Sequence, residues 1–362
     1  MKKTVFALTS ALAASAAIAV TTNTFYVGAG YAPDATHYTT VQAAFDAVPK
    51  NSADFYLIKI DAGTYREKVS IASKENVVVL GDAAHPENHV IQFDAASAKI
   101  NPATGKGYGT DGSATFTIGN YCDNLEFVGI TFDNCATRES LAATGQQAGQ
   151  ALAMLIHDYT GRQTFRKCRF LGYQDTLEPK TGICYFEDCY IEGEVDFIFA
   201  GAPSLFNRCE LHCHSSRSKI TAGSADAWRK VAFLFYRCRV TAPKGVSAAL
   251  GRSWRSTANV WFVDCDYGDA INAGGWTKWN DKTGETTLRE YGCRSNVVPN
   301  RPNGAGQWAE RILVTGSIDD FWTEFASFGY SDLRDILFAS NDNGATKSKI
   351  FKPEIRPAVI KR

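Results

Sequence analysis

The sequence predicts an all-β fold, a parallel β-helix in which short units stack as successive coils of one solenoid. Three observations lead to this prediction. A Phe-x-x-Cys-x-apolar segment recurs, successive cysteines lie 20 to 29 residues apart, and the units are too short for pairs of helices. The repeated segments begin at Phe165, Phe186, Phe206, Phe235 and Phe262.

Each unit alternates as a strand does. The cysteine and the apolar residue two positions later share one face, whereas the residues beside them are mostly charged or polar. Phe165 and Cys168 are three apart and cannot share a face of a straight strand, so a bend or bulge must separate them. Its position does not follow from the sequence. Residues 127–132 resemble an earlier coil with Ile130 in the cysteine position.

Both ends of a β-helix expose strand edges that need a cover. Residues 40–48 are predicted to form a short amphipathic helix with Val41, Ala44, Phe45 and Val48 on one side, capping the N-terminal end. Residues 321–338 are the expected C-terminal covering segment.

The first residues have the pattern of a secretory signal peptide, predicted at 1–19. Lys2 and Lys3 precede an apolar stretch, and Ala-Ile-Ala at 17–19 resembles a cleavage site. Residues 20–362 are then one domain, expected to be secreted and monomeric. Lys plus Arg and Asp plus Glu both number 38, so no overall field would attract nucleic acid or an anionic membrane.

The chain has ten cysteines. Those of the repeat are interpreted as buried free thiols, because cysteine often fills core positions as a small apolar residue. The pairs Cys122/Cys135 and Cys184/Cys213 lie outside the repeat and are the better disulfide candidates in a secreted protein.

Two aspartates share one position in the repeat. Asp175 and Asp196 each follow their own cysteine by seven residues, so consecutive coils would place one carboxyl above the other. Like charges this close make one group resist ionisation while the other stays charged. Either aspartate alone would be interpreted as a surface turn residue; the shared position favours an acid and a nucleophile.

Amides and an arginine accompany the aspartates. Gln174 precedes Asp175, and Gln150 lies in a strand-like segment one loop earlier. Neutral donors suit an oxyanion, although paired carboxyls alone also fit a retaining glycosidase. Arg252 would hold a carboxylate ionised. Taken alone, Gln150 is equally well interpreted as an exposed strand glutamine. Arg252 taken alone is an ordinary arginine near a turn.

Six motifs in this order resemble the pectin methylesterases (pectinesterases), carbohydrate esterases built on a right-handed parallel β-helix. The resemblance covers nearly all of the predicted mature chain, and the six together are highly specific. The motifs lie at 63–67, 150–153, 172–177, 193–199, 250–254 and 275–276.

The resemblance implies a role for each residue. Asp196 is the nucleophile that attacks the C6 methyl ester of galacturonate, and Asp175 protonates the departing methanol and then activates water. Gln150 and Gln174 form the anion hole, and Arg252 positions Asp196. Methylated pectin is the implied substrate, and no metal or organic cofactor is implied. Aromatic residues of the implied sugar groove are Tyr173, Phe199, Trp254 and Trp279.

Three residues depart from the family pattern. Glu178 stands where an aromatic residue is usual and would place a carboxyl in the groove. Ser253 replaces a proline, which should loosen its turn, and Ala200 replaces a glycine. None of these changes removes a catalytic group.

Other functions fit less well. A polygalacturonan backbone hydrolase would need further acids, but Asp319 and Asp320 lie far away in the sequence. A pectate lyase would need a calcium-binding acid cluster. A relative that acts on acyl thioesters is a further alternative. A non-catalytic carbohydrate-binding β-helix would have no reason to stack two acids beside amides and an arginine. His212 and His214 lack further ligands and are interpreted as strand-face residues. No Gly-x-Ser-x-Gly motif indicates a serine hydrolase.

Overall fold

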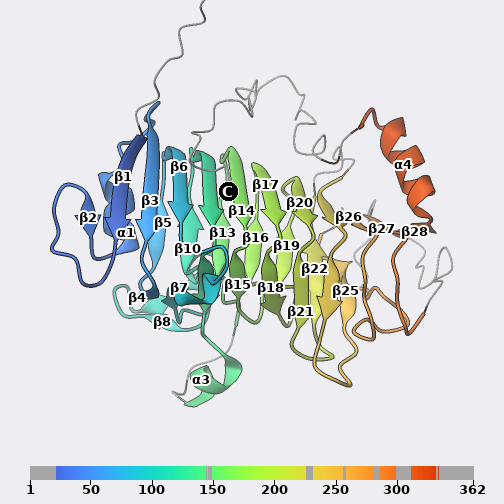
Figure 1. The fold of residues 1–362 in the computed structure, drawn as a ribbon. Coiled ribbons are helices and arrows are strands. Elements are labelled where there is room, and N and C mark those ends of the chain that lie inside the picture. The colour runs from blue at the N-terminus through green and yellow to red at the C-terminus, as the bar shows by residue number, and fades with distance from the viewer. Residues whose placement is uncertain are drawn as a thin grey trace, which may run out of the picture.

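Three parallel sheets form the molecule in this computed structural model, which describes residues 22–143, 145, 149–225, 231–255, 258–279, 286–298, 311–331 and 333. The chain passes through sheets A, B and C in turn and then begins the next coil (Figure 1). The predicted parallel β-helix is therefore confirmed. The predicted leader, residues 1–19, lies outside the described residues.

Sheet A is the longest, with 12 strands among the described residues. In spatial order its strands are β2 (His37–Tyr38), β1 (Thr22–Val27), β3 (Phe55–Ile60), β6 (Glu75–Leu80), β11 (Asp123–Val128), β14 (Arg162–Arg166), β17 (Ile183–Glu187), β20 (Ser204–Asn207), β23 (Phe233–Tyr236), β26 (Ala258–Val263), β27 (Thr286–Tyr291) and β28 (Arg311–Gly316).

Sheets B and C have seven strands each in the described part of the chain. Sheet B contains β4 (Gly63–Arg66), β7 (His89–Phe93), β12 (Thr131–Asn134), β15 (Arg169–Leu171), β18 (Tyr190–Gly193), β21 (Glu210–Cys213) and β24 (Arg239–Thr241). Sheet C contains β5 (Val69–Ile71), β10 (Phe116–Ile118), β13 (Met154–Ile156), β16 (Leu177–Pro179), β19 (Ile198–Ala200), β22 (Lys219–Gly223) and β25 (Ala249–Ser253).

Short elements extend from the coils. An antiparallel hairpin joins β8 (Ile100–Asn101) to β9 (Lys106–Gly107), and the helices are α1 (Val41–Ala47), η1 (Pro86–Asn88), α2 (Gly109–Gly112), α3 (Arg138–Ala143) and α4 (Ile318–Ser327). Helices within the described ranges are all too short or too polar to cross a bilayer.

The bend that the sequence left unplaced lies at the residue before each repeat cysteine. This residue adopts a left-handed backbone conformation, with φ between 50° and 55°. The turn carries the chain from sheet A to sheet B, so that phenylalanine and cysteine both point inward although they are three apart. The left-handed residues are Lys167, Asp188, Arg208, Arg237 and Asp264.

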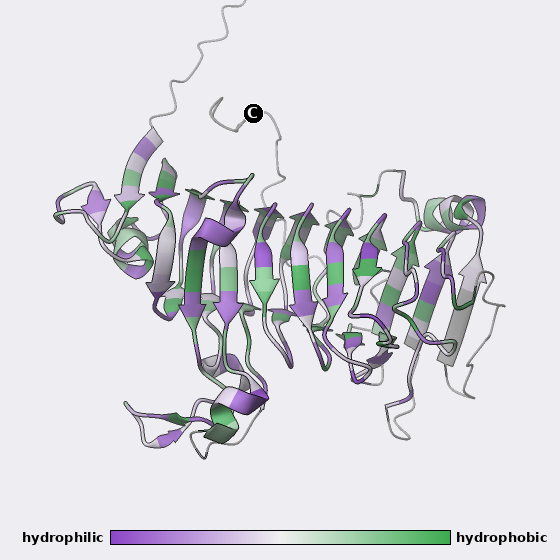
Figure 2. Ribbon diagram, turned by 60° about the horizontal axis from the view of Figure 1, so that its bottom comes forward, coloured by the Kyte–Doolittle hydropathy of each residue, from purple (hydrophilic) through white to green (hydrophobic). Residues whose placement is uncertain are grey.

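Identical side chains stack along the core. Phe186, Phe206 and Phe235 form a column with ring centroids 4.6 and 4.5 Å apart. Each repeat thiol donates a hydrogen bond to the backbone carbonyl of a phenylalanine on the preceding coil, as Cys209 does to Phe186 at 3.6 Å. Apolar and polar residues alternate along many strands, as the pattern predicted (Figure 2).

Every cysteine is a free thiol, so the predicted disulfides Cys122/Cys135 and Cys184/Cys213 are wrong. Cys184 lies in sheet A and Cys213 in sheet B, and Cys135 bonds the carbonyl of Phe93 instead.

Helix α1 caps the N-terminal end, as predicted. Thr40 accepts a hydrogen bond from the Ala43 amide, and Phe45 packs edge-on against Phe116 inside the first coils. Its buried face therefore closes the N-terminal end of the core.

Helix α4 begins before the predicted position 321, and the predicted end at 338 lies outside the described residues. Its Phe321 and Phe325 pack with Trp261 and Tyr291 on the outer face of sheet A. The C-terminal segment therefore covers a sheet face, whereas the sequence suggested a cover for the end of the coil.

Candidate active site

Asp175 and Asp196 occupy equivalent turns of consecutive coils. The Asp175 amide donates to the carbonyl of Val195 at 3.0 Å, and Leu177 pairs with Ile198 two residues later. Both aspartates lie between sheet B and sheet C with left-handed φ values of 63° and 54°. Aspartate tolerates this conformation better than most residues, and the predicted equal register is confirmed.

Arg252 reaches back from β25 to Asp196. Its Nε lies 2.8 Å from Oδ1 and its Nη2 lies 2.5 Å from Oδ2, a bidentate pair. The guanidinium also lies 3.8 Å from the centroid of the Trp279 ring. Burial raises the pKa of Asp196, but the two charge-assisted bonds from Arg252 oppose that shift. The pairing therefore favours a carboxylate at Asp196.

Asp175 lies in the same pocket and is also buried. Burial, then the charge of Asp196, then that of Glu178 raise the pKa of Asp175 to about 8. A carboxyl with this pKa keeps its proton at neutral pH. Two aspartates in equivalent positions thus have different electrostatic environments, because only Asp196 is paired with an arginine.

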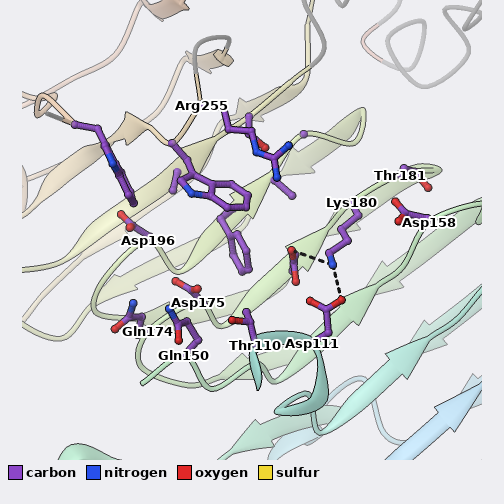
Figure 3. Close-up of a pocket in the computed structure, with 18 residues that line it drawn as sticks. Thr110, Asp111, Gln150, Asp158, Gln174, Asp175, Lys180, Thr181, Asp196 and Arg255 are labelled. Carbon is purple, nitrogen blue, oxygen red and sulfur yellow. Dashed lines mark hydrogen bonds and ion pairs between the residues drawn. The ribbon is translucent and has the colours of Figure 1, made fainter. Parts of the chain in front are cut away.

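Two amides lie on adjacent coils beside the carboxyls. The Ala151 amide donates to the Gln174 carbonyl at 3.0 Å, which places Gln150 next to Gln174. Ser97 Oγ donates to Gln150 Oε1 at 2.6 Å, so the amide nitrogen of Gln150 points away from Ser97. Figure 3 shows both amides next to Asp175. Two neutral amides therefore lie beside the carboxyls in the pocket.

Comparison with known proteins identifies the family of this chain. A family model described as Pectinesterase matches residues 31–312. The chain belongs to the pectinesterase family. It is therefore a carboxylic-ester hydrolase, and the family resemblance read from the six motifs is confirmed.

Two curated relatives and one solved structure show the extent of the similarity. Pectinesterase 31 of Arabidopsis thaliana is 33% identical over 267 residues, covering 71% of this chain and 78% of its own. The pectinesterase of Aspergillus niger is 30% identical over 338 residues, covering 89% and 98%. A pectin methylesterase variant solved in complex with a hexasaccharide shares the fold, with a TM-score of 0.68, 22% identity and coverage of 88% and 97%.

The groove of this pectinesterase lies over sheet C and has a volume of about 670 Å³. Eight predicted site residues line it. Arg252 is not among the lining residues, but it contacts one of them, Asp196. Tyr173 lies outside the lining set, because its ring packs edge-on against His214 at 4.7 Å. The lining residues predicted from the sequence are Gln150, Gln174, Asp175, Glu178, Asp196, Phe199, Trp254 and Trp279.

Glu178 places a carboxyl in the groove wall, as expected. It is only 2% exposed, and burial raises its pKa to about 8 although the Lys180 ammonium, 3.6 Å away, lowers it. Lys180 also bonds Asp111 at 2.6 Å (Figure 3). Within the described residues, Glu178 Oε2 is buried without a hydrogen-bond partner.

Sequence reasoning missed Lys180 and Asp111. Lys180 is two residues from Glu178. Because side chains alternate along a strand, the two lie on the same face, and this spacing could have identified Lys180 from the sequence. Asp111 comes from α2, and no local pattern connects it to β16.

The departures from the family pattern have visible consequences. Ser253 Oγ donates to the Arg255 carbonyl at 2.9 Å, so a hydrogen bond holds the turn that the missing proline was expected to loosen. Ala200 has a φ of 82°, a conformation that favours glycine. Phe199 packs edge-on against Trp254 at 5.8 Å and forms the aromatic wall.

The histidine pair has ordinary strand-face contacts. His212 Nδ1 lies 2.8 Å from Thr241 Oγ1, and His214 contacts Tyr173. In the part of the chain that the structure describes, no three His, Cys, Asp or Glu residues gather as metal ligands would. That the enzyme needs no metal remains a prediction.

Proposed function

We propose that this pectinesterase hydrolyses the methyl esters of galacturonate units in pectin and releases methanol and de-esterified pectin. The proposal depends on one observation, namely two stacked carboxyls beside two amides, of which only Asp196 is paired with an arginine. The family supports ester hydrolysis, and the hexasaccharide complex of a structural neighbour supports a galacturonate polymer as substrate.

In the first step the ionised Asp196 attacks the C6 carbonyl carbon. Negative charge moves to the carbonyl oxygen, where Gln150 and Gln174 stabilise it by donating hydrogen bonds. Asp175 gives its proton to the methoxy oxygen as the C–O bond breaks, and methanol leaves. The product of this step is an anhydride between Asp196 and the galacturonate.

In the second step Asp175 is a carboxylate and takes a proton from water. The hydroxide attacks the C6 carbon of the anhydride, and the bond to Asp196 breaks. Asp196 is again a carboxylate paired with Arg252, Asp175 is again protonated, and the released galacturonic acid ionises in solvent. One residue acts as acid and then base, which a pKa of about 8 permits.

Backbone hydrolysis of polygalacturonan is the second candidate, because retaining glycosidases also use two close carboxyls. The amides favour the ester reaction, since an oxocarbenium ion is positive and gains nothing from amide donors. Incubation with methylated pectin, with methanol and new reducing ends both quantified, separates the two. Reducing ends without methanol would support the backbone hydrolase.

The nucleophile role is tested by Asp196→Asn. We expect loss of methanol release with an unfolding temperature that is unchanged or higher, because an amide cannot form the anhydride but fills the same space. Near-normal turnover by the variant would reject Asp196 as the nucleophile.

We also propose that residues 1–19 are removed on secretion and that residues 20–362 act outside the cell as one monomeric domain. The proposal rests on the leader pattern. Sequencing the N-terminus of protein from culture medium should find a start at residue 20. A cell-retained protein that still begins at Met1 would contradict it.

A further inference from the structure

Two tyrosines lie side by side on the surface at the corner between sheets C and A. Tyr121 and Tyr159 are 64% and 72% exposed, the highest values among the large apolar residues that the structure describes. Their rings are 6.3 Å apart and 23° from parallel. The Tyr121 amide donates to the Tyr159 carbonyl at 3.0 Å, so the rings come from adjacent coils.

Folding does not account for these side chains. Tyr121 and Tyr159 have left-handed φ values of 62° and 56°, which are unfavourable for a bulky residue. On the neighbouring coils the equivalent corner residues are Ser73 and Gly182, which also have a positive φ. Exposed rings recover little of that cost through burial. Strained residues without a packing role often have a functional one.

The corner is continuous with the groove. Asp158, which precedes Tyr159, and Thr181 of the next coil both line the groove at the end away from the two catalytic aspartates (Figure 3). His157 Nδ1 lies 3.0 Å from Asn120 Oδ1, and Thr160 Oγ1 donates to the Thr181 carbonyl at 3.2 Å. These bonds order the corner before any ligand binds, which lowers the entropic cost of binding.

We propose that Tyr121 and Tyr159 form an aromatic platform that binds sugar rings of the same pectin chain where it leaves the groove. An aromatic face is negative and attracts the weakly positive C–H groups of a sugar ring. Because both rings are mostly exposed and come from adjacent coils, they offer aromatic surface to consecutive sugar units. This inference rests on the proposed function, because it takes the occupant of the groove to be a galacturonate polymer.

The test compares substrates of two lengths. The ratio of kcat/KM for long methylated homogalacturonan to kcat/KM for methylated trigalacturonate is measured for the wild type and for Tyr121→Ala/Tyr159→Ala. We expect the ratio to fall about tenfold, the factor that corresponds to 1.4 kcal/mol. A short substrate held at the carboxyls does not extend to the platform, so the ratio separates platform loss from damage to the site.

Two matched variants sharpen the result. Tyr121→Phe/Tyr159→Phe keeps both rings and should keep the wild-type ratio. Trp322→Ala removes another exposed aromatic residue, on α4 over sheet A, and should also keep it. An unchanged ratio in the double alanine variant, or an equal fall in the double phenylalanine variant, would overturn the stacking proposal.

Binding of fully de-esterified polygalacturonate distinguishes this inference from the proposed function. If the wild type released no methanol from any pectin, the proposed function would fail. Weaker polygalacturonate binding by the double alanine variant, measured by calorimetry, would still support the platform. Equal binding by both proteins would contradict the platform alone.

Discussion

At the scale of single residues, the site depends on the difference between two identical side chains. Asp175 and Asp196 share residue type, turn and register, yet only Asp196 is paired with Arg252. The arginine favours one charge, and that charge together with burial keeps the proton on the other carboxyl. In the proposed mechanism, the neighbours of each aspartate therefore decide which one is the acid and which the nucleophile.

This difference predicts the alkaline limit of activity. Asp175 must hold a proton to release methanol, and its raised pKa means that the proton is present below about pH 8 and lost above it. We expect kcat/KM to fall as the pH rises through about 8, as a pH–rate profile would show. If another group governs the fall of kcat/KM at high pH, the same fall should persist in a variant that lacks Asp175 but retains measurable turnover. That outcome would contradict the prediction.

Glu178 adds a second effect at residue scale. Its charge raises the pKa of Asp175, so Glu178→Gln should move the alkaline limb to lower pH. Above about pH 8, where Glu178 ionises, the variant should also bind partly de-esterified pectin with a lower KM, because a galacturonate carboxylate beside Lys180 and Asp111 would no longer meet the charge of Glu178. Glu87→Gln, on η1, is a matched control. An unmoved limb and unchanged KM would show that Glu178 does not act on the groove.

At the scale of elements, each coil is held by its corner and its core column. The left-handed residue before each cysteine turns the chain, and the phenylalanine before the corner stacks on its counterpart one coil away. Because the sheets have parallel strands in register, a column of one residue type continues through many coils. The stacked columns therefore set the register that aligns Asp175 with Asp196.

Phe206 lies in the middle of this column. It is fully buried between Phe186 and Phe235, so Phe206→Ala should lower the free energy of unfolding by about 3–5 kcal/mol through the cavity it leaves. Phe206→Leu should cost less, because more volume is retained. Urea denaturation measures both. A cost near zero for the alanine variant would mean that the column is not tightly packed.

At the scale of the whole molecule, stability comes from continuous burial along the solenoid and from its two covering helices. Eight of the ten cysteines are part of this burial as free thiols. The hydrogen bonds of the repeat cysteines to phenylalanine carbonyls link one coil to the next, as Cys238 does to Phe206 at 3.3 Å. Covalent links between coils are absent at the positions that the structure describes.

Reductant should therefore leave the unfolding temperature unchanged. Calorimetric scans with and without dithiothreitol measure this, and alkylation of the unfolded protein counts the thiols. We expect all ten to react without prior reduction. A drop of several degrees in reductant, or fewer reactive thiols, would indicate a disulfide.

Much of the candidate site could be predicted from the sequence, because repeat position alone aligned Asp175 with Asp196. The motifs also located Gln150, Gln174 and Arg252. The prediction failed where contacts depend on which sheet a residue occupies. Cys184 and Cys213 were paired by exclusion from the repeat, but they belong to different sheets. Tyr173 was placed in the groove by resemblance, but its ring packs against His214.

The sequence by itself determined the coil, its period and the stacking of the two acids, because each coil carries its own local pattern of apolar and polar residues. Only the tertiary structure decided how those acids differ. The bonds of Ser97 to Gln150, Arg252 to Asp196 and Lys180 to Asp111 join residues 53, 56 and 69 positions apart. No local pattern specifies such contacts, because they arise only when the coils are stacked in space.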